Sequence, residues 1–565
     1  MDLNLLRRQA QEAARNFLEN DKEYRMGYIE AEQPHPLTRK LSQTYQASMA
    51  DGIRMILSVD EQMAARACET LCNEAYADFA DTIRKTIMQG GRVVFSGCGS
   101  SGRLSMRLEQ SWRNAIAKLS SQYPDAQDAL MEKLESVCNI MTGGDYAVIR
   151  AVESFEDSTR LGEEQAKELG LSKGDLLVGV TATGETTSIL GTAIQALRDG
   201  ASVYMLICAD HRPLIEKMER ARAVYLNPAC KVMYLPCGPM ALTGSTRMQS
   251  STFEQFAGAV ALEHALCDIL KTQGIDANPQ EYGWFGQQFL GMIHQLLSDK
   301  SVDVIKNASE IEQKVYENGG LMTLFADEYL LDVLTDTTER APTFMTPPFC
   351  SADMKQQEQS WAFVKNPCCD TDSAWIRCFL REPHCINWDL DKYAQLGLTQ
   401  RQIAKIFDIS SAALKRFMIG NEEMPERESV KCSHALWVDA DSAPAEFEAQ
   451  ANRYQSHSQL TIRDAGVSCP ETAMDIFEHI CIKLMLNTLS TGVMARMGRV
   501  DGNWMTCLAM SNKKLVDRSA RIVSDVCGVS YEVALEEIYY SQALAEAQGL
   551  HLSPAQEAIR RLGIN

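Results

Sequence analysis

Residues 93–103, Val-Val-Phe-Ser-Gly-Cys-Gly-Ser-Ser-Gly-Arg, constrain the fold of this chain more than any other segment. The run Val93–Phe95 predicts the end of a buried strand, and apolar residues at helical spacing follow Gly102. Many α/β proteins bind phosphate with a strand, a glycine- and serine-rich turn and a helix. The glycines let the backbone approach the anion, and the amides at the helix N-terminus donate to it. The hydroxyls of Ser100 and Ser101 would add ligands. No Gly-Lys-Ser/Thr sequence follows, which excludes a P-loop.

Strand candidates alternate with helical segments through the first half of the chain, after a polar and mostly helical start. This alternation predicts a parallel sheet covered by helices on both faces. Ligands of such sheets bind beyond the carboxyl ends of the strands, where the polar turns of this sequence lie. The strand candidates are 92–96, 138–142, 176–181, 203–208 and 232–235.

Further motifs accompany the first one. They are Gly-Val-Thr-Ala-Thr-Gly-Glu-Thr-Thr at 179–187, Leu-Thr-Gly-Ser-Thr-Arg-Met at 242–248 and Leu-Asn-Thr-Leu-Ser-Thr-Gly-Val at 486–493. Together with 142–157 and in this order, they resemble the sugar isomerase (SIS) domain family. The similarity is closest to the branch of the N-acetylmuramic acid 6-phosphate etherases and the glucokinase regulatory protein, and it covers nearly the whole chain. It implies α/β, flavodoxin-like domains that bind a hexose phosphate or an N-acetylated amino-sugar phosphate.

The spacing of the motifs predicts the domain organisation. More than two hundred residues separate Met248 from Leu486, where a single-domain etherase would pass almost directly from one motif to the next. The glucokinase regulatory protein has a second SIS domain in this position. We therefore expect two tandem SIS domains and a small all-helical C-terminal cap. The predicted units are an N-terminal helical segment (1–50), a ligand-binding SIS domain (51–285), a degenerate SIS domain (286–480), a motif helix returning to the first domain (481–510) and a ubiquitin-associated-like cap (511–565).

The inserted region contains its own strand candidates, at 319–325, 361–365 and 434–438. The turn after its first strand is Ala326-Asp-Glu-Tyr329, with two carboxylates and no glycine. Carboxylates repel a phosphate, and side chains hinder a close backbone approach. The second domain is therefore predicted to have lost the ligand and to keep a structural or partner-binding role.

The resemblance also implies an acid–base chemistry. The etherases eliminate lactate across C2–C3 of their substrate and then add water, and they use two glutamates for this. Alignment on the loop places Ser111 where the first glutamate stands. Glu109 lies about 200° around the helix axis from that position and cannot replace it. The second glutamate matches Glu156, which we expect to accept a sugar hydroxyl and to be catalytic only if the protein is an enzyme.

The predicted binding residues come from these motifs and from the start of the cap. Glu185 and Gln249 stand where the etherases have cations, which predicts weaker phosphate binding or a different sugar. Arg103 and Arg247 either contact the ligand or form ion pairs that pack their helices. The predicted binding set is Gly99, Ser100, Ser101, Gly102, Arg103, Glu156, Thr181, Ala182, Thr183, Gly184, Thr186, Ser245 and Lys514.

The composition excludes several classes of function. A net charge of −20 disfavours nucleic acid and anionic membranes as partners. The sequence has neither a signal-peptide pattern at its start nor an apolar run of membrane-spanning length. Its 18 cysteines are scattered without Cys-x-x-Cys spacing, which favours reduced thiols in a cytoplasmic protein. The nine histidines do not cluster at ligand spacing, so neither a metal nor another cofactor is predicted.

We therefore expect a bacterial-type sugar-phosphate sensor or regulator similar to the glucokinase regulatory protein, with a sugar kinase as a candidate protein partner. The first alternative is an enzyme, either an etherase that releases D-lactate or another sugar-phosphate lyase or isomerase. The second is a transcriptional regulator, because residues 398–415 resemble a helix-turn-helix, although the acidic charge favours two ordinary packed helices. A monomer and a homodimer are both compatible with two tandem domains.

Overall fold

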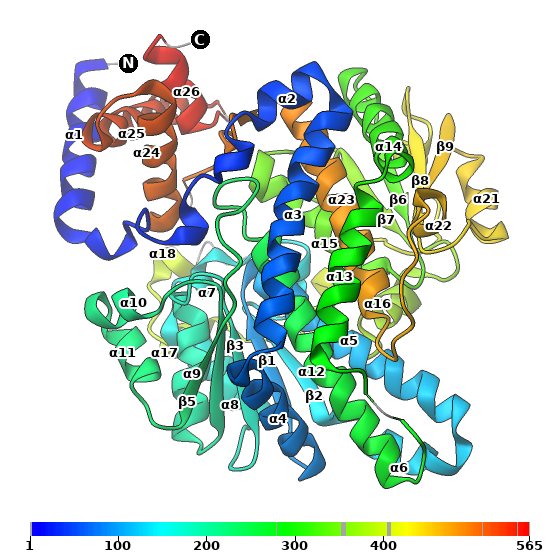
Figure 1. Ribbon diagram of the computed structural model, residues 1–565. Helices are drawn as coiled ribbons and strands as arrows, with labels where there is room; N and C mark the ends of the chain where they lie inside the picture. Colours follow the sequence, from blue (N-terminus) through cyan, green and yellow to red (C-terminus); the bar gives the residue numbers. More distant parts are fainter. Residues whose placement is uncertain are drawn as a thin grey trace.

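The structure is a computed structural model that describes residues 3–277, 279–351, 358–403, 408–510, 512–550 and 552–563. Two parallel sheets flanked by helices lie on either side of a set of long central helices, and a separate helical group covers one end (Figure 1). The predicted α/β fold with two sheets and C-terminal helices is confirmed. We call the sheets with their flanking helices the first and second lobes. The helical group, α1 with α24–α26, is the cap.

The first lobe is built on a five-stranded sheet with the order β2-β1-β3-β4-β5. All neighbouring strands pair in parallel, and β1 lies between β2 and β3, with Val93 opposite both Val137 and Leu176. Each strand lies within two residues of its predicted position. The bounds are β1 (Val93–Gly97), β2 (Val137–Met141), β3 (Leu176–Val180), β4 (Ser202–Ile207) and β5 (Cys230–Tyr234).

Helices cover both faces of the first sheet, as the alternating pattern predicts. The longest are α3 (Met49–Leu71), α4 (Glu74–Met88), α5 (Gly99–Gln122), α8 (Thr159–Leu169), α9 (Thr187–Arg198) and α12 (Gln249–Thr272). Shorter helices connect them: α2 (Leu41–Ala47), α6 (Gln127–Glu132), α7 (Glu153–Glu156), α10 (Arg212–Lys217) and α11 (Glu219–Tyr225).

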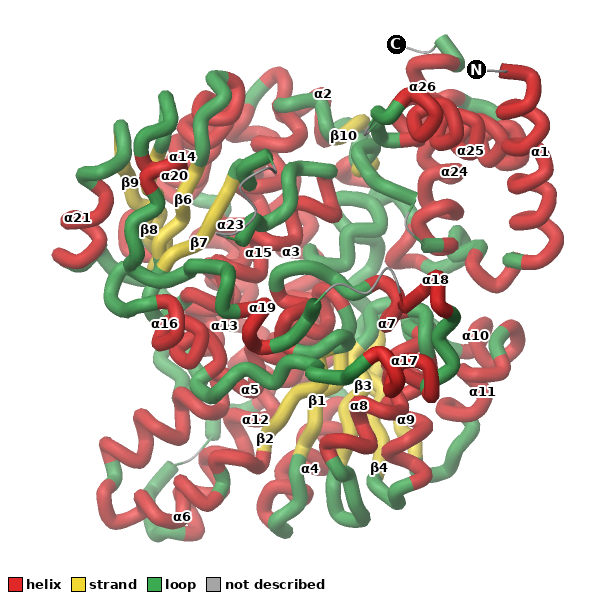
Figure 2. Tube along the Cα trace, turned by 180° about the vertical axis from the view of Figure 1, so that it is seen from behind, coloured by secondary structure: helices red, strands yellow, loops and turns green. Residues whose placement is uncertain are grey.

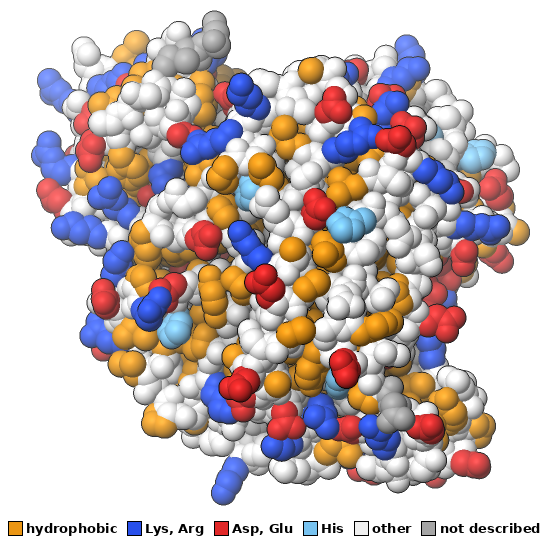
Figure 3. Space-filling model, viewed as in Figure 1, with side chains coloured by type: hydrophobic (Ala, Val, Ile, Leu, Met, Phe, Trp, Pro, Cys, Tyr) orange, Lys and Arg blue, Asp and Glu red, His pale blue; other side chains and the backbone are white. Residues whose placement is uncertain are grey.

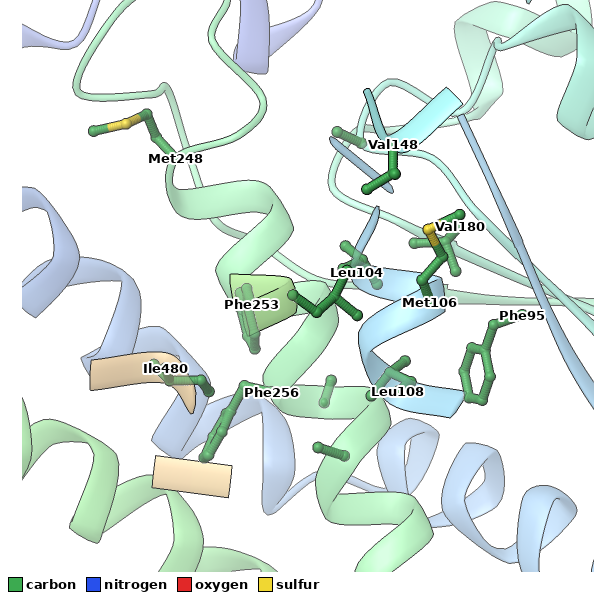
Figure 4. Close-up of a cluster of buried hydrophobic side chains, with 14 of the residues drawn as sticks. Phe95, Leu104, Met106, Leu108, Val148, Val180, Met248, Phe253, Phe256 and Ile480 are labelled. Carbon is green, nitrogen blue, oxygen red and sulfur yellow. The ribbon is translucent and has the colours of Figure 1, made fainter. Parts of the chain in front are cut away.

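The core of the molecule lies where α5 and α12 pack together (Figure 4). Leu108 of α5 and Phe253 and Phe256 of α12 are almost completely buried there. Ile480, from α23 (Ile476–Arg496), packs into the same region from a distant part of the sequence (Figure 4). Because α12 is buried along nearly its whole length, it connects the first lobe to the helices shared with the second.

The second lobe has a four-stranded parallel sheet with the order β7-β6-β8-β9. Three of its strands, β6 (Met322–Phe325), β7 (Ala362–Lys365) and β8 (His434–Asp439), coincide with predicted ones. The fourth, β9 (Ser456–Thr461), was not predicted, because it begins with the polar residues Ser-His-Ser-Gln at an exposed edge. The helices of this lobe are α13 (Tyr282–Leu296), α14 (Asp299–Glu317), α15 (Leu330–Phe344), α16 (Thr371–Phe379), α17 (Leu390–Gln395), α18 (Gln400–Ile403), α19 (Ser411–Leu414), α20 (Pro425–Glu428), α21 (Ala445–Ala451) and α22 (Ile462–Ala465).

Short helices and loops run between the two sheets on the side seen in Figure 2. They include α17, which precedes the segment that resembles a helix-turn-helix (398–415), and α18 and α19, which lie within it. Residues 404–407, in the middle of this segment, lie outside the described residues. The expectation of two ordinary packed helices here, and the helix-turn-helix as its alternative, both stay untested.

The cap joins the two ends of the chain (Figure 1). Helix α1 (Leu3–Asn20) packs against α25 (Tyr531–Gln548), and α24 (Lys513–Cys527) and α26 (Pro554–Arg561) complete a small core of their own. Buried ion pairs connect the cap to the segment after α1: Arg518 and Arg521 both bind the fully buried Glu32. Two short strands, β10 (Val500–Asp501) and β11 (Trp504–Met505), precede the cap.

On the face shown in Figure 3, acidic and basic side chains are interspersed. None of the 18 cysteines, all of which lie in the described residues, forms a disulfide. No helix within the described residues combines the length and the apolar character needed to span a membrane.

Candidate functional site

A cavity of about 220 Å³ lies at the carboxyl edge of the first sheet, between the first lobe, α15 of the second lobe and α24 of the cap. All predicted binding residues except Gly102 and Gly184 line it. Its walls are formed by Cys98, Gly99, Ser100, Ser101, Arg103, Ala151, Glu156, Thr181, Ala182, Thr183, Thr186, Gly244, Ser245, Thr246, Arg247, Glu339, Pro342, Thr343, Met505, Leu508, Asn512, Lys514, Leu515 and Arg518.

The turn from β1 into α5, residues 97–103, is called the phosphate loop here. A Cβ at Gly97 would lie 2.3 Å from the carbonyl oxygen of Ser101, and Gly99 has a φ of +55°. Gly102 faces away from the cavity, and a Cβ there would lie 2.0 Å from Met141 Sδ. Its hydrogen lets the first turn of α5 approach β2, and a contact between Gly102 and a ligand stays a prediction.

The turn from β3 into α9 contributes hydroxyl groups. Thr181 Oγ1 and Thr186 Oγ1 lie 2.9 Å apart within hydrogen-bonding distance, and Thr183 also lines the cavity. Gly184 has a φ of +75°, and its carbonyl oxygen accepts a hydrogen bond from Tyr225 Oη at 2.6 Å. Gly184 turns the backbone beside the cavity and is not among the residues that line it, so its contact with a ligand stays a prediction.

Lys514 brings a cation from the cap to the cavity, as the sequence predicts. Its Nζ lies 3.3 Å from Oε1 of the buried Glu185. Burial opposes the charge of Lys514, but Glu185 and neighbouring carboxylates outweigh this effect and raise its pKa. Arg518, one helical turn further along α24, lines the same wall. The sequence analysis missed Arg518, although its spacing of four residues from Lys514 places both on one helix face.

The second lobe also supplies a carboxylate. Glu339, on α15, accepts a hydrogen bond from Ser100 Oγ at 2.7 Å and lies 3.5 Å from the guanidinium of Arg103. Its side chain is only 8% exposed. Glu339 and Glu156 line the same cavity from different lobes. Residue patterns near Glu339 carry no sign of this position, and the sequence analysis did not identify it.

Arg247 also connects the lobes. Its guanidinium lies 2.8 Å from Asp336 of α15 and 2.8 Å from Thr491 Oγ1 of α23. Arg103 and Arg247 are both buried, and both form ion pairs with the second lobe. Both also line the cavity. The ion pairs that the sequence analysis considered for both arginines are present, and their contact with a ligand stays a prediction.

The position of the missing glutamate lies outside the cavity. Ser111 Oγ accepts a hydrogen bond from Arg107 at 3.0 Å. Glu109 is buried and bound by Arg113 at 3.0 Å and by Arg381 of the second lobe at 2.8 Å. Burial opposes ionisation of Glu109, but Arg381 and Arg113 outweigh it and lower the pKa of this carboxyl. Neither Ser111 nor Glu109 is placed to act on a ligand in the cavity.

The corresponding edge of the second sheet is rich in carboxylates. Asp327 binds Asn366 Nδ2 at 2.8 Å, and Glu328 binds Lys118 at 2.9 Å. Burial raises the pKa of Asp439, at the end of β8, to about 7. Within the described residues, no group of three or more His, Cys, Asp or Glu side chains is arranged to hold a metal ion.

Comparisons with known proteins show which family part of this chain resembles. Residues 76–197 match the family model of the glucokinase regulatory protein N-terminal SIS domain. This stretch contains the phosphate loop, Glu156 and the turn from β3 into α9.

Curated relatives include N-acetylmuramic acid 6-phosphate etherases. The one from Aliivibrio fischeri is 30% identical over 200 residues, which is 35% of this chain and 58% of the relative. Etherase 1 of Vibrio cholerae is 30% identical over 205 residues, 36% of this chain and 59% of the relative. The chain thus spans less than two thirds of the length of these relatives.

Solved structures with a similar course of the chain include sugar-phosphate enzymes. Tagatose-6-phosphate ketose/aldose isomerase from Escherichia coli has a TM-score of 0.42 at 8% identity and covers 83% of this chain and 97% of its own. The C-terminal domain of glucosamine-fructose-6-phosphate aminotransferase from Francisella tularensis has a TM-score of 0.40 at 8% identity, covering 79% and 96%.

Proposed function

Because this chain belongs to the SIS domain family, in the branch of the glucokinase regulatory protein and the N-acetylmuramic acid 6-phosphate etherases, we propose that it senses a sugar phosphate and regulates in response. The ligand is a hexose phosphate or an N-acetylated amino-sugar phosphate, bound in the cavity of the first lobe. The observation that carries this proposal is that hydroxyls, helix N-termini, cations and carboxylates line one cavity.

The wall offers two kinds of group. Amides at the start of α5, the hydroxyls of Ser100 and Ser101 and the ammonium of Lys514 suit a phosphate. Glu156 and Glu339 suit the sugar, because carboxylates accept hydrogen bonds from hydroxyl groups. This combination supports a ligand that carries both an anionic and a polyhydroxyl part.

The regulatory role is favoured over catalysis by the residues at the first glutamate position. Ser111 cannot act as a base, and Glu109 is held by two arginines away from the cavity. On this reading a sugar kinase is the candidate protein partner. The kinase activity of a purified sugar kinase from the same organism should then change when this protein and a sugar phosphate are both present.

A lyase is the second candidate, and the position of Glu339 favours it. In an etherase reaction, one group removes the C2 proton and another protonates the ether oxygen as the C3–O bond breaks. Water then adds to the unsaturated product. Glu156 and Glu339 line one cavity and could divide these roles between base and acid.

One experiment separates the two candidates. Purified protein is incubated with N-acetylmuramic acid 6-phosphate, and D-lactate is measured beside a Glu156→Gln variant. The sensor proposal expects no lactate, while this sugar phosphate or a fructose phosphate raises the melting temperature of the protein. Lactate release that disappears in the variant would establish the lyase. No binding of any sugar phosphate at millimolar concentration in calorimetry would overturn both.

A further inference from the structure

Glu254 lies directly beneath the phosphate loop and has no part in the cavity wall. It belongs to α12 and is completely buried. Its Oε2 accepts a hydrogen bond from Ser101 Oγ at 3.3 Å, and its Oε1 lies 3.8 Å from Cys208 Sγ, at the end of β4. Ser101 itself lines the cavity, so Glu254 is one hydroxyl group away from a bound phosphate.

The surroundings of Glu254 favour its neutral form at pH 7. Burial raises the pKa of its carboxyl to about 8, although Ser101, Cys208 and Lys483 act in the opposite direction. The positive charge of Lys483, on α23, favours the ionised form of Glu254. The Nζ of Lys483 donates hydrogen bonds to the carbonyl oxygen of Arg247 at 2.7 Å and to Thr252 Oγ1 at 2.8 Å.

A serine hydroxyl has a single proton to donate. When Glu254 is ionised, its carboxylate accepts the hydrogen bond of the Ser101 hydroxyl. Only the lone pairs of Ser101 Oγ then remain to face a phosphate. When Glu254 is protonated, its own O–H can donate to Ser101 Oγ, which releases the serine proton toward the ligand. The two protonation states therefore differ in what the loop offers to an anion.

We propose that Glu254 is a positioning residue of the phosphate loop: its protonated carboxyl orients the Ser101 hydroxyl so that this hydroxyl donates to the phosphate of the ligand. This inference rests on the proposed sugar-phosphate binding and adds a regulation to it. Binding of the dianion stabilises protonated Glu254, so the protein takes up a proton from solution as the ligand binds. Affinity therefore falls as the pH rises above the range where Glu254 is neutral.

Other titratable groups lie in this region, and the experiment must distinguish their protonation from that of Glu254. Cys208 stays a thiol, because burial raises its pKa well above the usual value and the neighbouring Cys237 acts in the same direction. Asp60, on α3, accepts a hydrogen bond from Gln249 Nε2 at 2.7 Å, and burial raises its pKa to about 7. Lys483 titrates in the same range, since burial lowers its pKa to about 8, and it is the alternative source of a proton effect.

The test is calorimetry of fructose 6-phosphate, and of N-acetylmuramic acid 6-phosphate, at pH 7, 8 and 9 in two buffers of different ionisation enthalpy. Phosphate monoesters are dianions throughout this range, because their second pKa is about 6. We expect Kd to rise about tenfold between pH 7 and pH 9, with uptake of about half a proton per ligand at pH 8.

A Glu254→Gln variant should bind with a Kd that does not change between pH 7 and pH 9 and without proton uptake, because its amide donates at every pH. Its melting temperature should match that of the wild type at pH 7. Ser101→Ala should bind more weakly at pH 7 and lose the pH dependence. Glu263→Gln is the matched control on the same helix. Burial raises the pKa of Glu263 to about 7, but it binds the amides of Ala473 and Met474, so the proton uptake should persist.

Proton uptake that survives in Glu254→Gln would assign the effect to Lys483 and overturn the inference. A wild-type Kd that is constant from pH 7 to pH 9 would overturn it as well, while leaving the proposed function intact. If neither sugar phosphate binds at any pH, the proposed function is wrong and this inference falls with it.

Discussion

Ser100 Oγ donates a hydrogen bond to Glu339 Oε1 over 2.7 Å, which joins the phosphate loop of the first lobe to helix α15 of the second. The two residues are 239 positions apart in the chain. Any ligand that occupies the cavity meets this pair, because both side chains line it. The second lobe, whose own strand edge is rich in carboxylates, thus takes part in the site of the first.

Substitution of Glu339 by Gln should affect two ligands in opposite directions. A carboxylate beside the phosphate loop repels an anion but binds sugar hydroxyl groups strongly. Inorganic phosphate should therefore bind Glu339→Gln more tightly than wild type. A sugar phosphate should bind roughly tenfold more weakly, the order of one charged hydrogen bond. Calorimetry with both ligands checks this, and a parallel change for both would contradict it.

Lys514 and Glu185 should likewise have opposite effects on phosphate affinity. Lys514→Met removes a cation from the wall and should weaken sugar-phosphate binding roughly tenfold or more. Glu185→Gln removes the carboxylate that competes for Lys514, so affinity should rise a few-fold. Asp21→Asn is the control, because Asp21 binds the neighbouring Lys513 on the exposed side of the same helix, at 2.6 Å. Weaker binding by Glu185→Gln would show that Glu185 positions Lys514 instead.

The attachment of the cap should depend on pH through Glu32. Burial opposes ionisation of this carboxyl, but Arg518 and Arg521 outweigh it and lower its pKa to about 2. Its stabilising contribution is therefore complete above about pH 4.5 and is lost as the pH falls toward 2. At pH 7, Glu32→Gln should cost about 3 kcal/mol in the free energy of cap opening. Hydrogen exchange of α24 peptides measures this, with the exposed Glu30→Gln as a silent control.

Arg381 should contribute strongly to the association of the lobes. It reaches from the second lobe to Glu109 at 2.8 Å and Asp145 at 2.5 Å, both buried in the first. Arg381→Met leaves two buried carboxylates without this partner and should lower the free energy of unfolding by roughly 3–5 kcal/mol. Arg377→Met removes a half-exposed arginine of α16 that binds Asp327, and should cost roughly 0–1 kcal/mol. Urea unfolding compares the two, and equal losses would refute the assignment.

Gly102 should tolerate no larger side chain. A Cβ at this position would lie 2.0 Å from Met141 Sδ and 2.8 Å from the carbonyl oxygen of Gly97, so the phosphate loop must move. Gly102→Ala should lose roughly 1–3 kcal/mol of stability and most of the affinity for sugar phosphates. Gly291→Ala, in α13 with open space around its Cβ, should instead gain roughly 0.5–1 kcal/mol. Thermal unfolding and calorimetry of both variants test the contrast.

The parts of the site that follow a strand could be predicted from sequence. Ser100, Thr183 and Ser245 stand in short patterns in which a strand or turn, glycines and a helix are adjacent, so local chemistry indicates their position. Glu339 stands within α15, between Thr338 and Arg340 and away from any glycine-rich turn, and only the packing of the two lobes brings it to the cavity. The predicted domain boundaries, and the roles of the site residues in binding, stay predictions.

In the fold, too, local sequence patterns predicted some elements, whereas features that depend on tertiary packing could not be predicted. The apolar strands β1, β3 and β6 were predicted because burial on both faces gives continuous apolar runs. The edge strand β9 lacks such a run, since its first four residues are polar and largely exposed. Helix α1 packs with α25 at the far end of the chain, a contact that depends on tertiary structure alone.

The pairing of Ser100 with Glu339 within one polypeptide has a consequence for how the site responds to dilution. A cavity shared between separate subunits comes apart when the protein concentration falls below the dissociation constant of the assembly. Here the peptide chain holds the two halves at an effective concentration in the millimolar range. The cavity therefore stays complete when the protein is diluted, and at a given pH its occupancy follows the concentration of the ligand and not that of the protein.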